Sequence, residues 1–490
     1  MSTGLSRLPY AFARSHGMVI GDESETEVEV FAREDAGAAS LTELRRFAGK
    51  PLRLVTLGRA AFETRLAEAY SHSDGNAAEI VADVGQDIDV SLLMQELPAV
   101  EDLLEAEDDA PIIRMINALL TQSVRQHASD IHIEPYEDYS VVRFRRDGAL
   151  CEIARPHRAL HAAMASRIKI MAGLDIAEKR LPQDGRISVR LAGRHIDVRV
   201  STLPASHGER IVLRLLDKES TQYGLDSLGM DARIVSSFQD LLGQPHGILL
   251  VTGPTGSGKT TTLYAGLRTL DVKSRNIVTV EDPVEYDLHG VGQTQVNSRI
   301  DLSFARALRA ILRQDPDVVM IGEIRDLETA QIAVQASLTG HLVLATLHTN
   351  DAPSAITRLI DMGIEPFLLA STLRGVLAQR LVRKLCPVCR TSHPATDFER
   401  EIIGKACPEI VWDAAGCNAC SQAGYAGRTG IYELLEVGPE AQSLIHDRAS
   451  EAQLREASTR TGLRSLREDG IRLIAEGITS PAELLRIARD

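Results

Sequence analysis

Residues 247–260 read Gly247-Ile-Leu-Leu-Val-Thr-Gly-Pro-Thr-Gly-Ser-Gly-Lys-Thr260, an apolar run followed by a glycine-rich loop. The apolar run is long enough for one buried strand, and a helix is predicted after the loop. A glycine-rich loop between a strand and a helix matches the phosphate-binding pattern G-x-x-x-x-G-K-[ST] in its expected context. The alternative is a chance glycine-rich turn, and both flanks argue against it. We therefore predict a nucleotide-phosphate site here.

Each residue type in the loop has a physical part in this prediction. Glycines let backbone N–H groups turn toward phosphate oxygens, and the helix N-terminus adds partial positive charge. Lys259 can reach the β- and γ-phosphates, and the Thr260 hydroxyl can hold Mg²⁺. The predicted nucleotide-binding residues are Gly253, Pro254, Thr255, Gly256, Ser257, Gly258, Lys259, Thr260 and Thr261.

Strands and helices alternate around this loop, from about Tyr223 onward. The predicted strands are 247–252, 276–280, 317–321 and 342–347, and the predicted helices are 260–270, 304–313 and 330–338. Apolar strands separated by helices indicate a parallel sheet that is covered on both faces.

Two of these strands lead into carboxylates. Asp317-Val-Val-Met-Ile-Gly-Glu323 ends in Glu323, at the edge where α/β sheets bind ligands, although a surface glutamate is the alternative. Glu281 and Asp282 follow the strand at 276–280, just before Pro283. Carboxylates there could activate the attacking water or bind a magnesium-coordinated water. This second motif would be weak alone, because acidic turns after strands are common.

Two histidines flank the strand at 342–347. His341 precedes it, and His348 follows it together with Thr349. Polar groups at this edge could sense the γ-phosphate, but satisfied structural histidines explain the pattern equally well.

Four of the six cysteines form two Cys-x-x-Cys pairs, Cys386/Cys389 and Cys417/Cys420. In a large chain without an export signal, this spacing favours metal over disulfides. Four thiolates suit structural zinc, because they leave no open position for catalysis. The gap between the pairs predicts a small excursion that contains Trp412.

The first 220 residues show a different pattern. Residues 1–75 mix strands at 28–31 and 52–57 with helical stretches at 41–47 and 60–70, and residues 76–110 read as an acidic linker. A helix at 112–126 then precedes predicted strands at 130–134, 140–145, 187–191 and 195–200. Period-two alternation places Arg186 and Arg199 on polar faces of the last two strands.

The bulk properties limit the class of protein. The chain has 490 residues, a net charge of −14 and 44% hydrophobic residues, which is typical of two to four globular domains. We expect no bilayer span and no secretory signal, and hence a cytoplasmic protein that touches membranes through partners. The acidic balance argues mildly against nucleic-acid binding.

The glycine loop, Glu281-Asp-Pro-Val-Glu285, Gly322-Glu-Ile-Arg-Asp326 and Leu344-Ala-Thr-Leu-His-Thr-Asn-Asp351 resemble, in this order, four motifs of one superfamily. These motifs are the Walker A, Asp box, Walker B and His box of the secretion and type IV pilus ATPases. Ser129-Asp-Ile-His-Ile-Glu-Pro135 resembles the type II secretion and pilus extension branches. The opening Leu8-Pro-Tyr-Ala-Phe12 is similar to the type II secretion ATPase (general secretion pathway protein E) family.

This resemblance implies a multidomain α/β fold. A RecA-like P-loop ATPase domain with a parallel sheet would span 221–490 and include a zinc-binding tetracysteine module at 386–432. An α+β, PAS-like domain would span 111–220, and residues 1–75 would form a small α/β domain that docks on a partner.

The resemblance also implies roles for individual residues. Lys259 and Thr260 would bind ATP–Mg²⁺, Glu281 would be the general base, and His348 would sense the nucleotide. Glu323 would hold magnesium through water, with Asp282 as a further magnesium ligand. Arg186, Arg199 and Arg210 would reach the nucleotide of the same or a neighbouring subunit.

The implied function is a hexameric ATP-driven motor for pseudopilus assembly and protein export, using ATP, Mg²⁺ and Zn²⁺. It would act at the cytoplasmic face of the bacterial inner membrane, on a bitopic docking protein and a polytopic platform protein. The alternatives are a type IV pilus extension motor, a nucleotide-regulated scaffold and a nucleic-acid translocase. Carboxylates at Glu281 and Glu323 argue against a pure scaffold.

Overall fold

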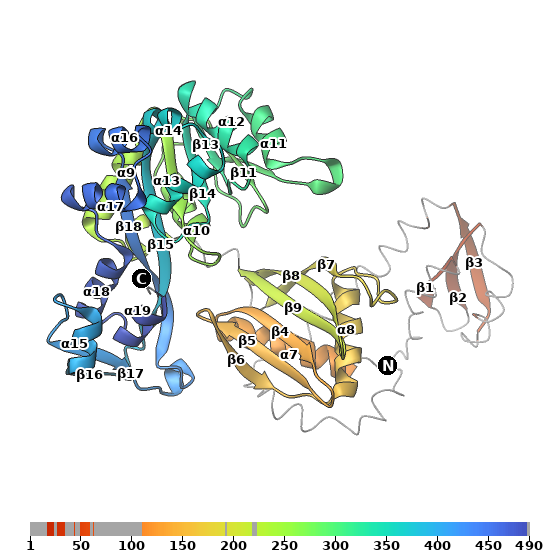
Figure 1. Ribbon diagram of the computed structural model, residues 1–490. Helices are drawn as coiled ribbons and strands as arrows, with labels where there is room; N and C mark the ends of the chain where they lie inside the picture. The colour runs from red at the N-terminus through yellow and green to blue at the C-terminus, as the bar shows by residue number, and fades with distance from the viewer. Residues whose placement is uncertain are drawn as a thin grey trace.

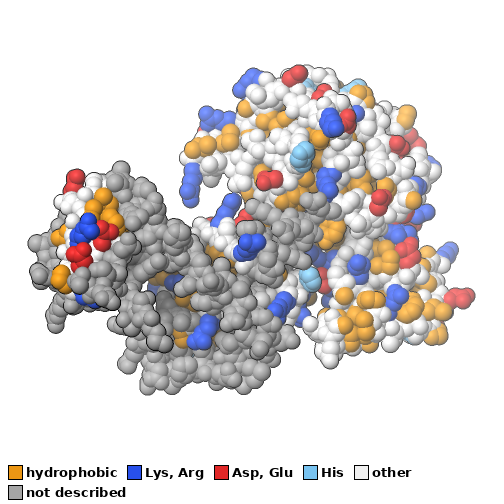
Figure 2. All heavy atoms as spheres, turned by 180° about the vertical axis from the view of Figure 1, so that it is seen from behind, with side chains coloured by type: hydrophobic (Ala, Val, Ile, Leu, Met, Phe, Trp, Pro, Cys, Tyr) orange, Lys and Arg blue, Asp and Glu red, His pale blue; other side chains and the backbone are white. Residues whose placement is uncertain are grey.

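The computed structural model describes residues 17–23, 27–34, 44, 50–58, 62, 110–191, 194–217 and 223–487. The described strands form sheets of three, six, seven and two strands. Figure 1 shows the six-stranded sheet beside the seven-stranded sheet, with the two-stranded sheet at the lower left. No helix among the described residues is long and apolar enough to cross a membrane. In the view of Figure 2, basic and acidic side chains are interspersed over the coloured surface.

The seven-stranded sheet carries the glycine loop at the end of its strand β10. In spatial order its strands are β12 (Gly292–Gln295), β11 (Ile277–Glu281), β13 (Val318–Ile321), β14 (Leu342–Leu347), β10 (Gly247–Thr252), β15 (Leu373–Leu385) and β18 (Tyr425–Glu436). The strands from β12 to β15 are parallel, which confirms the predicted parallel sheet. β18 pairs antiparallel with β15 and adds an edge strand that the sequence analysis did not anticipate.

Helices cover both faces of this sheet, because β10 is apolar on both sides. Ile248 and Leu250 belong to one buried cluster, and Leu249 and Val251 to another. The first cluster includes residues of α11 (Phe304–Ile311), α12 (Leu327–Leu338), α13 (Ala352–Asp361), α14 (Pro366–Thr372), α16 (Pro439–His446) and α17 (Glu451–Arg460). The second includes residues of α9 (Ala232–Leu242) and α10 (Lys259–Leu267). Two buried faces explain why the strand sequence is continuously apolar.

The predicted elements of this sheet recur with small shifts at their ends. β10 and β14 have the predicted bounds, and β11 and β13 each start one residue later than predicted. The helix after the loop, α10, ends at Leu267 rather than residue 270, and α12 begins three residues earlier, after the capping residue Asp326. Caps decide these ends, and the apolar pattern alone does not locate them.

The six-stranded sheet is antiparallel and belongs to a second hydrophobic core. Its order is β6 (Ala149–Ala154), β5 (Ser140–Arg146), β4 (Ala128–Pro135), β9 (Gly208–Asp217), β8 (Arg194–Ala205) and β7 (Gln183–Leu191). α7 (Ala110–Arg125) and α8 (Arg158–Met171) pack on its apolar face. The strands predicted at 130–134, 140–145, 187–191 and 195–200 and the helix at 112–126 are confirmed. β6, β9 and α8 were not predicted.

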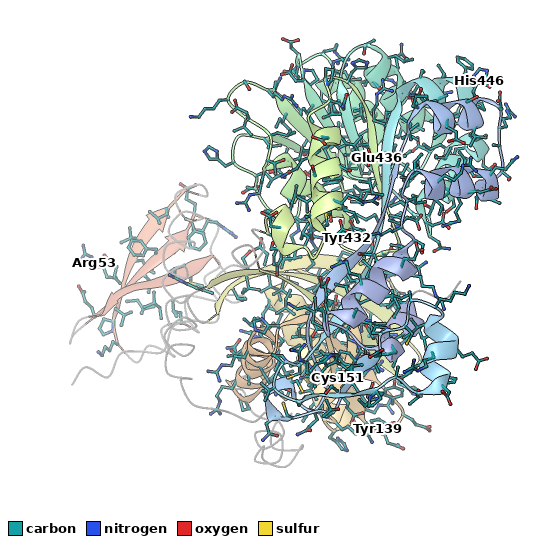
Figure 3. All side chains as sticks on the ribbon, turned by 90° about the vertical axis from the view of Figure 1, so that its left-hand side faces the viewer. Arg53, Tyr139, Cys151, Tyr432, Glu436 and His446 are labelled. Carbon is teal, nitrogen blue, oxygen red and sulfur yellow. The ribbon has the colours of Figure 1, made fainter. Side chains whose placement is uncertain are left out.

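The cysteine excursion and the last helices form a smaller module. It contains β16 (Arg390–Pro394), α15 (Asp397–Ile403) and β17 (Ile410–Ala414), with α18 (Leu466–Ala475) and α19 (Pro481–Ile487) packed beside them. Long strand β18 joins this module to the large sheet, and Figure 3 marks Tyr432 and Glu436 on it. The Tyr432 N–H donates to the Asp469 carboxylate of α18 at 2.9 Å, so the strand and the module are tied together.

The described N-terminal residues form a three-stranded sheet. Its strands are β1 (Met18–Glu23), β2 (Val28–Arg33) and β3 (Leu52–Leu57). The strands predicted at 28–31 and 52–57 are confirmed. The helical stretches predicted at 41–47 and 60–70 lie outside the described residues, apart from Leu44 and Phe62, which are buried against the sheet. The acidic segment predicted at 76–110 also lies outside them, except for Ala110.

Candidate active site

The glycine loop turns sharply between β10 and α10. Gly253 has a φ of 147°, and a Cβ there would lie 2.3 Å from the carbonyl oxygen of Gln379. Gly258 caps α10 with a φ of 88°, in the left-handed region. Side chains at these two positions would be strained, which explains why the loop needs glycine. The N-terminus of α10 therefore opens onto the loop, where its free N–H groups can bind an anion.

Lys259 is the buried cation of this loop. Its ammonium group donates to the carbonyl oxygens of Gly253 at 2.8 Å and Pro254 at 3.1 Å. Burial lowers the pKa of Lys259 to about 8, although the nearby Glu323 carboxylate acts in the opposite direction. A weakly hydrated ammonium held by carbonyl groups can be attracted by phosphate oxygens.

A large cleft surrounds the loop. Its volume is about 1130 Å³, and it is lined by residues from both the seven-stranded and the six-stranded sheets. From the nucleotide-binding prediction it includes 255–261, and from the carboxylate predictions it includes Glu281, Asp282 and Glu323. The six-stranded sheet and its surroundings contribute His127, Asp130, Arg145 and Arg214. The cleft therefore brings together groups that are far apart in the sequence.

Glu323 follows β13 and faces the histidine at the end of β14. One of its oxygens lies 3.3 Å from Nε2 of His348, and the other accepts a hydrogen bond from Arg325. The Glu323 side chain is 13% exposed, whereas the His348 side chain is 46% exposed. Sequence reasoning named Glu323 and His348, but it did not single out Arg325, which stands two residues after the strand carboxylate.

The structure separates the two histidines that the sequence left equal. His341 donates from Nδ1 to the carbonyl oxygen of Ala336 at 2.8 Å, so it closes the end of α12. His348 instead contacts Glu323 in the cleft. The strand end beside it is held by Thr252, whose hydroxyl lies 2.8 Å from the Thr349 hydroxyl. His341 therefore has the structural place, and His348 lies at the candidate site.

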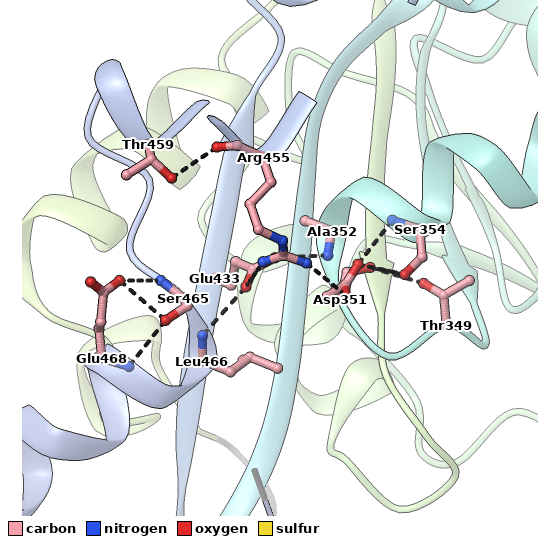
Figure 4. A network of polar contacts seen from close by, with 10 residues as sticks. All are labelled: Thr349, Asp351, Ala352, Ser354, Glu433, Arg455, Thr459, Ser465, Leu466 and Glu468. Atoms are coloured by element: carbon pink, nitrogen blue, oxygen red, sulfur yellow. Dashed lines mark hydrogen bonds and ion pairs between the residues drawn. The ribbon is translucent and has the colours of Figure 1, made fainter. Parts of the chain in front are cut away.

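The chain after His348 is anchored by a buried network, shown in Figure 4. The Glu433 carboxylate of β18 accepts from the N–H groups of Ala352 at 2.9 Å and Leu466 at 3.4 Å, at the starts of α13 and α18. Arg455 of α17 bridges Glu433, at 3.6 Å, and Asp351, at 2.7 Å. Burial raises the pKa of Glu433, while the Ala352 amide and Arg455 oppose that shift. This network fixes the segment that leaves the candidate site.

Glu281 is buried at the end of β11 and is 2% exposed. Its carboxylate accepts hydrogen bonds from the Tyr264 hydroxyl, from Thr279 Oγ1 at 2.5 Å and from Gln293 Nε2 at 3.1 Å. Burial, reinforced by the Glu281 carboxylate, raises the pKa of Tyr264 above its ordinary range.

Sequence reasoning missed Tyr264 and Gln293, the partners of Glu281. The one available signal was a tyrosine on the helix after the loop, because a buried tyrosine hydroxyl needs a hydrogen-bond partner. Asp282 lies beside this group at the cleft wall, where its charge acts on Arg325.

The three predicted arginines lie in different surroundings. Arg199 of β8 reaches Glu285 across the gap between the two sheets, at 3.3 Å. Arg210 pairs with Glu134 within its own sheet at 2.5 Å. Arg186 is exposed on β7, opposite Arg199 in the strand register. The structure thus joins Arg199 to the site and does not bring Arg210 or Arg186 to it.

Two further arginines line the cleft and were missed. Arg145 and Arg214 flank Asp130, at 3.6 Å and 2.9 Å, from the strands on either side of β4. The alternation Val141-Val-Arg-Phe-Arg145 could have indicated that Arg143 and Arg145 share the polar face.

The four predicted cysteines lie together. The sulfur atoms of Cys386 and Cys417 are 3.9 Å apart, and those of Cys389 and Cys420 are 3.8 Å apart. Tetrahedral zinc with Zn–S bonds of about 2.3 Å requires sulfur–sulfur distances of about 3.8 Å. Burial raises the pKa of the Cys420 thiol, but the backbone N–H groups of Cys417 and Gly424 outweigh it and hold that pKa at about 7. The donor set and its geometry therefore fit one structural zinc ion.

Comparisons with known proteins agree with this site. Residues 105–486 match the family described as type II/IV secretion system protein, and residues 7–70 match an N-terminal domain of GSPII protein E. The chain is 56% identical to the type II secretion system protein HxcR of Pseudomonas aeruginosa, over 99% of this chain and 100% of that one. It is 53% identical to the type II secretion system ATPase E of Vibrio cholerae, over 99% of this chain and 97% of that one.

Solved structures share the fold. The pilus retraction motor PilT, solved with bound ADP, is 26% identical with a TM-score of 0.53, over 76% of this chain and 97% of that one. The Legionella pneumophila ATPase DotB is 21% identical with a TM-score of 0.56, over 76% of this chain and 95% of that one. At 21% identity, the second likeness concerns the fold alone.

Proposed function

This chain belongs to the type II/IV secretion system protein family and is an ATP-hydrolysing secretion ATPase, and we propose that its hydrolysis drives pseudopilus assembly for bacterial protein export. The observation that carries the proposal is the cleft of about 1130 Å³, which has the glycine loop on one wall and arginines of the six-stranded sheet on the other. A nucleotide bound there would contact two parts of the chain. Loss of its γ-phosphate would then change the contact between those parts.

We assign the phosphate grip to the loop and its lysine. Residues 253–261 would surround the triphosphate with backbone N–H groups, and Lys259 would neutralise the β- and γ-phosphates. Mg²⁺, when bound, neutralises charge that develops on the phosphate oxygens. Thr260, Asp282 and Glu323 are the residues that would hold it, and hydroxyl and carboxylate oxygens are the donors that Mg²⁺ prefers.

Glu281 is our proposed general base. Three hydrogen bonds hold its carboxylate in one orientation. A carboxylate offers about four acceptor positions, so it can still receive a proton from the attacking water. His348, at 3.3 Å from Glu323, is placed to respond when the groups around the γ-phosphate change.

Arginines would couple the chemistry to movement. Arg199 contacts Glu285, two residues after Pro283, and would transmit changes at the nucleotide to the six-stranded sheet within one chain. Arg186 is exposed, so it is our candidate for an arginine that completes the site of a neighbouring subunit. Arg210 would join it after leaving Glu134. Such a ring, which we propose to be a homohexamer, would hydrolyse ATP only when assembled.

The remaining assignments concern zinc and partners. We propose that Cys386, Cys389, Cys417 and Cys420 hold one structural zinc ion, which their spacing fits. Residues 1–75, of which 7–70 match the N-terminal domain of GSPII protein E, would dock on a bitopic inner-membrane protein, and the motor would also engage a polytopic platform protein. The chain would thus act at the cytoplasmic face of the inner membrane without binding nucleic acid.

Type II secretion is better supported than pilus extension. The relatives named for type II secretion are 53% and 56% identical to the chain, whereas the pilus retraction motor is 26% identical. Deletion of the gene should stop export of type II substrates into the medium and leave pilus-dependent surface motility intact. Wild-type protein should restore export, and the Glu323→Gln variant should not. Loss of motility with normal export would overturn the proposal.

A further inference from the structure

A second group of metal-binding side chains lies in the excursion between the two cysteine pairs. It consists of His393 of β16, Glu399 of α15 and Asp413 of β17, whose ligand atoms all lie within 4.8 Å of one another. None of these residues takes part in the nucleotide site or in the tetracysteine group.

We propose that His393, Glu399 and Asp413 form a second metal site, which binds a divalent transition cation such as Zn²⁺ and joins the three elements of the excursion. The ligand atoms are Nε2 of His393, one oxygen of Glu399 and one oxygen of Asp413. Imidazole and carboxylate groups together suit zinc and similar divalent ions.

The distances between the ligand atoms match those around one ion. Nε2 of His393 lies 3.1 Å from Oδ2 of Asp413 and 3.7 Å from Oε1 of Glu399. A tetrahedral zinc ion with ligand bonds of about 2.0–2.1 Å places its ligand atoms about 3.3 Å apart. The two observed distances bracket this value, so small side-chain movements would complete the geometry.

The backbone places two of the three ligands on one face. In the antiparallel pair of β16 and β17, His393 stands opposite Val411, and Asp413 stands opposite Thr391. His393 and Asp413 are therefore diagonal neighbours on the same face of the ribbon, within reach of each other. α15 connects the two strands and presents Glu399 from its first turn.

Other hydrogen bonds orient the histidine and the glutamate for this role. Nδ1 of His393 lies 2.9 Å from the carbonyl oxygen of Pro394, which can only accept, so Nδ1 carries the proton. This leaves the Nε2 lone pair directed at the two carboxylates, the arrangement typical of metal-ligating histidines. The second oxygen of Glu399 accepts from the N–H and the hydroxyl of Thr396, at 2.8 Å and 2.7 Å. Its first oxygen thus remains for the ion.

The site has an entry path and one open position. The side chains of His393 and Glu399 are 31% and 14% exposed, and that of Asp413 is 54% exposed. Three protein ligands leave a fourth tetrahedral position for water. The tetracysteine group has no such position, so the two sites should differ in how readily a chelator removes their metal.

The chain carries a natural reporter for this site. Trp412, the only tryptophan in the sequence, precedes Asp413 on β17. It packs beneath Arg390, whose guanidinium carbon lies 4.6 Å from the ring centre. A paramagnetic ion bound at Asp413 should quench the fluorescence of this tryptophan.

The test uses the full chain with its tetracysteine group already loaded with zinc. After equilibration with excess zinc and removal of unbound ion, the wild-type protein should contain two zinc ions per chain, and the variants His393→Ala and Asp413→Asn should contain one. Co²⁺ titration should quench Trp412 in the wild type, and should need at least about tenfold more Co²⁺ in either variant. Thr391→Ala, on the same face of the ribbon, should behave as the wild type.

Two results would overturn the proposal. One is a wild-type protein that holds a single zinc ion and whose fluorescence does not change with Co²⁺, which would mean that His393 only forms ion pairs. The other is a variant that binds the second ion as tightly as the wild type. Retention of one zinc per chain in Asp413→Asn, a substitution of nearly equal shape, shows that the tetracysteine module remains folded.

Discussion

Lys259 combines two features that oppose each other: it must be charged to hold phosphate, and it is buried. Burial lowers its pKa to about 8, well below the ordinary value of 10.5. The carbonyl oxygens of Gly253 and Pro254 partly compensate for the lost hydration. Phosphate groups favour the charged form, so nucleotide binding should be linked to the protonation of this lysine.

The affinity for magnesium ATP should therefore fall as pH rises above about 8. In the free protein, Lys259 loses its proton there, and binding must then restore it. The expected decrease approaches tenfold for each pH unit above about 8. Equilibrium binding measured from about pH 7 to about pH 9.5 tests this. Lys259→Ala should bind weakly throughout without this slope, and a flat wild-type profile would contradict the prediction.

Tyr264 is a positioning residue for Glu281, and it should affect the pH dependence of hydrolysis. Tyr264→Phe removes one hydrogen bond to the carboxylate and should raise the pKa of Glu281. Because such a bond is worth about 1.5–3 kcal/mol, the acid limb of the kcat profile should move up by about 1–2 pH units. Turnover measured against pH tests this. An unshifted limb with merely lower stability would assign Tyr264 a structural role only.

At the scale of elements, Glu433 holds two helix starts and a neighbouring helix on one strand. Glu433→Ala would leave the N–H groups of Ala352 and Leu466 and part of the Arg455 charge without a partner. We expect a loss of about 2–4 kcal/mol in unfolding free energy. Denaturant titration measures it. The matched control is Glu468→Ala, which removes an exposed cap of α18 and should cost about 1 kcal/mol.

The cysteine module should depend on zinc for its stability. Cys417→Ser should abolish the tetracysteine zinc and lower the unfolding temperature of the part built from β16, β17, α18 and α19, with a loss on the order of several kcal/mol. Zinc content after a mild chelator wash and thermal unfolding would show this. Cys407→Ser is the matched control, because Cys407 lies outside the sulfur group. Equal zinc content in both variants would contradict the assignment.

Elements were predictable where their signal is local. β10 and β14 are continuous apolar runs that need no partner to be recognised, and both have the predicted bounds. β18 was not predicted, because its buried half begins only after the exposed residues around Arg428 and is completed by pairing with β15. The end of α10 was placed too late, because the pattern of buried residues does not show where packing stops.

At the scale of the whole molecule, the two sheets meet through few charged contacts. Arg199 pairs with Glu285, and Asp147 accepts from the N–H of Gly427 at 3.1 Å and lies 3.7 Å from Arg428. Contacts between charged, partly exposed groups are individually weak. The six-stranded sheet can therefore move relative to the ATPase sheet when the nucleotide changes.

Hydrolysis should depend on assembly, because Arg186 is exposed on a strand that the nucleotide of its own chain does not contact. Dilution should lower the specific rate of hydrolysis by about tenfold or more, and reconcentration should restore it. Nucleotide affinity should change much less, because the glycine loop lies within one chain. Hydrolysis rates and sedimentation, measured over the same range of concentrations, test this. A specific rate that is constant down to the monomer would contradict the role of Arg186.

The sequence by itself determined the glycine loop, the apolar strands beside it and the two cysteine pairs. Each of these depends on contiguous residues, whose glycine positions, apolar runs or short spacing already limit the backbone to one kind of structure. It also indicated which strands end in carboxylates.

Only the tertiary structure decided which of those groups meet. Tyr264 reaches Glu281, His348 reaches Glu323, and Arg199 reaches Glu285. These pairs join strands and helices whose order in the sheet differs from their order in the chain. Such contacts depend on how the sheet is assembled and how its faces are packed, and a local pattern carries no information about either.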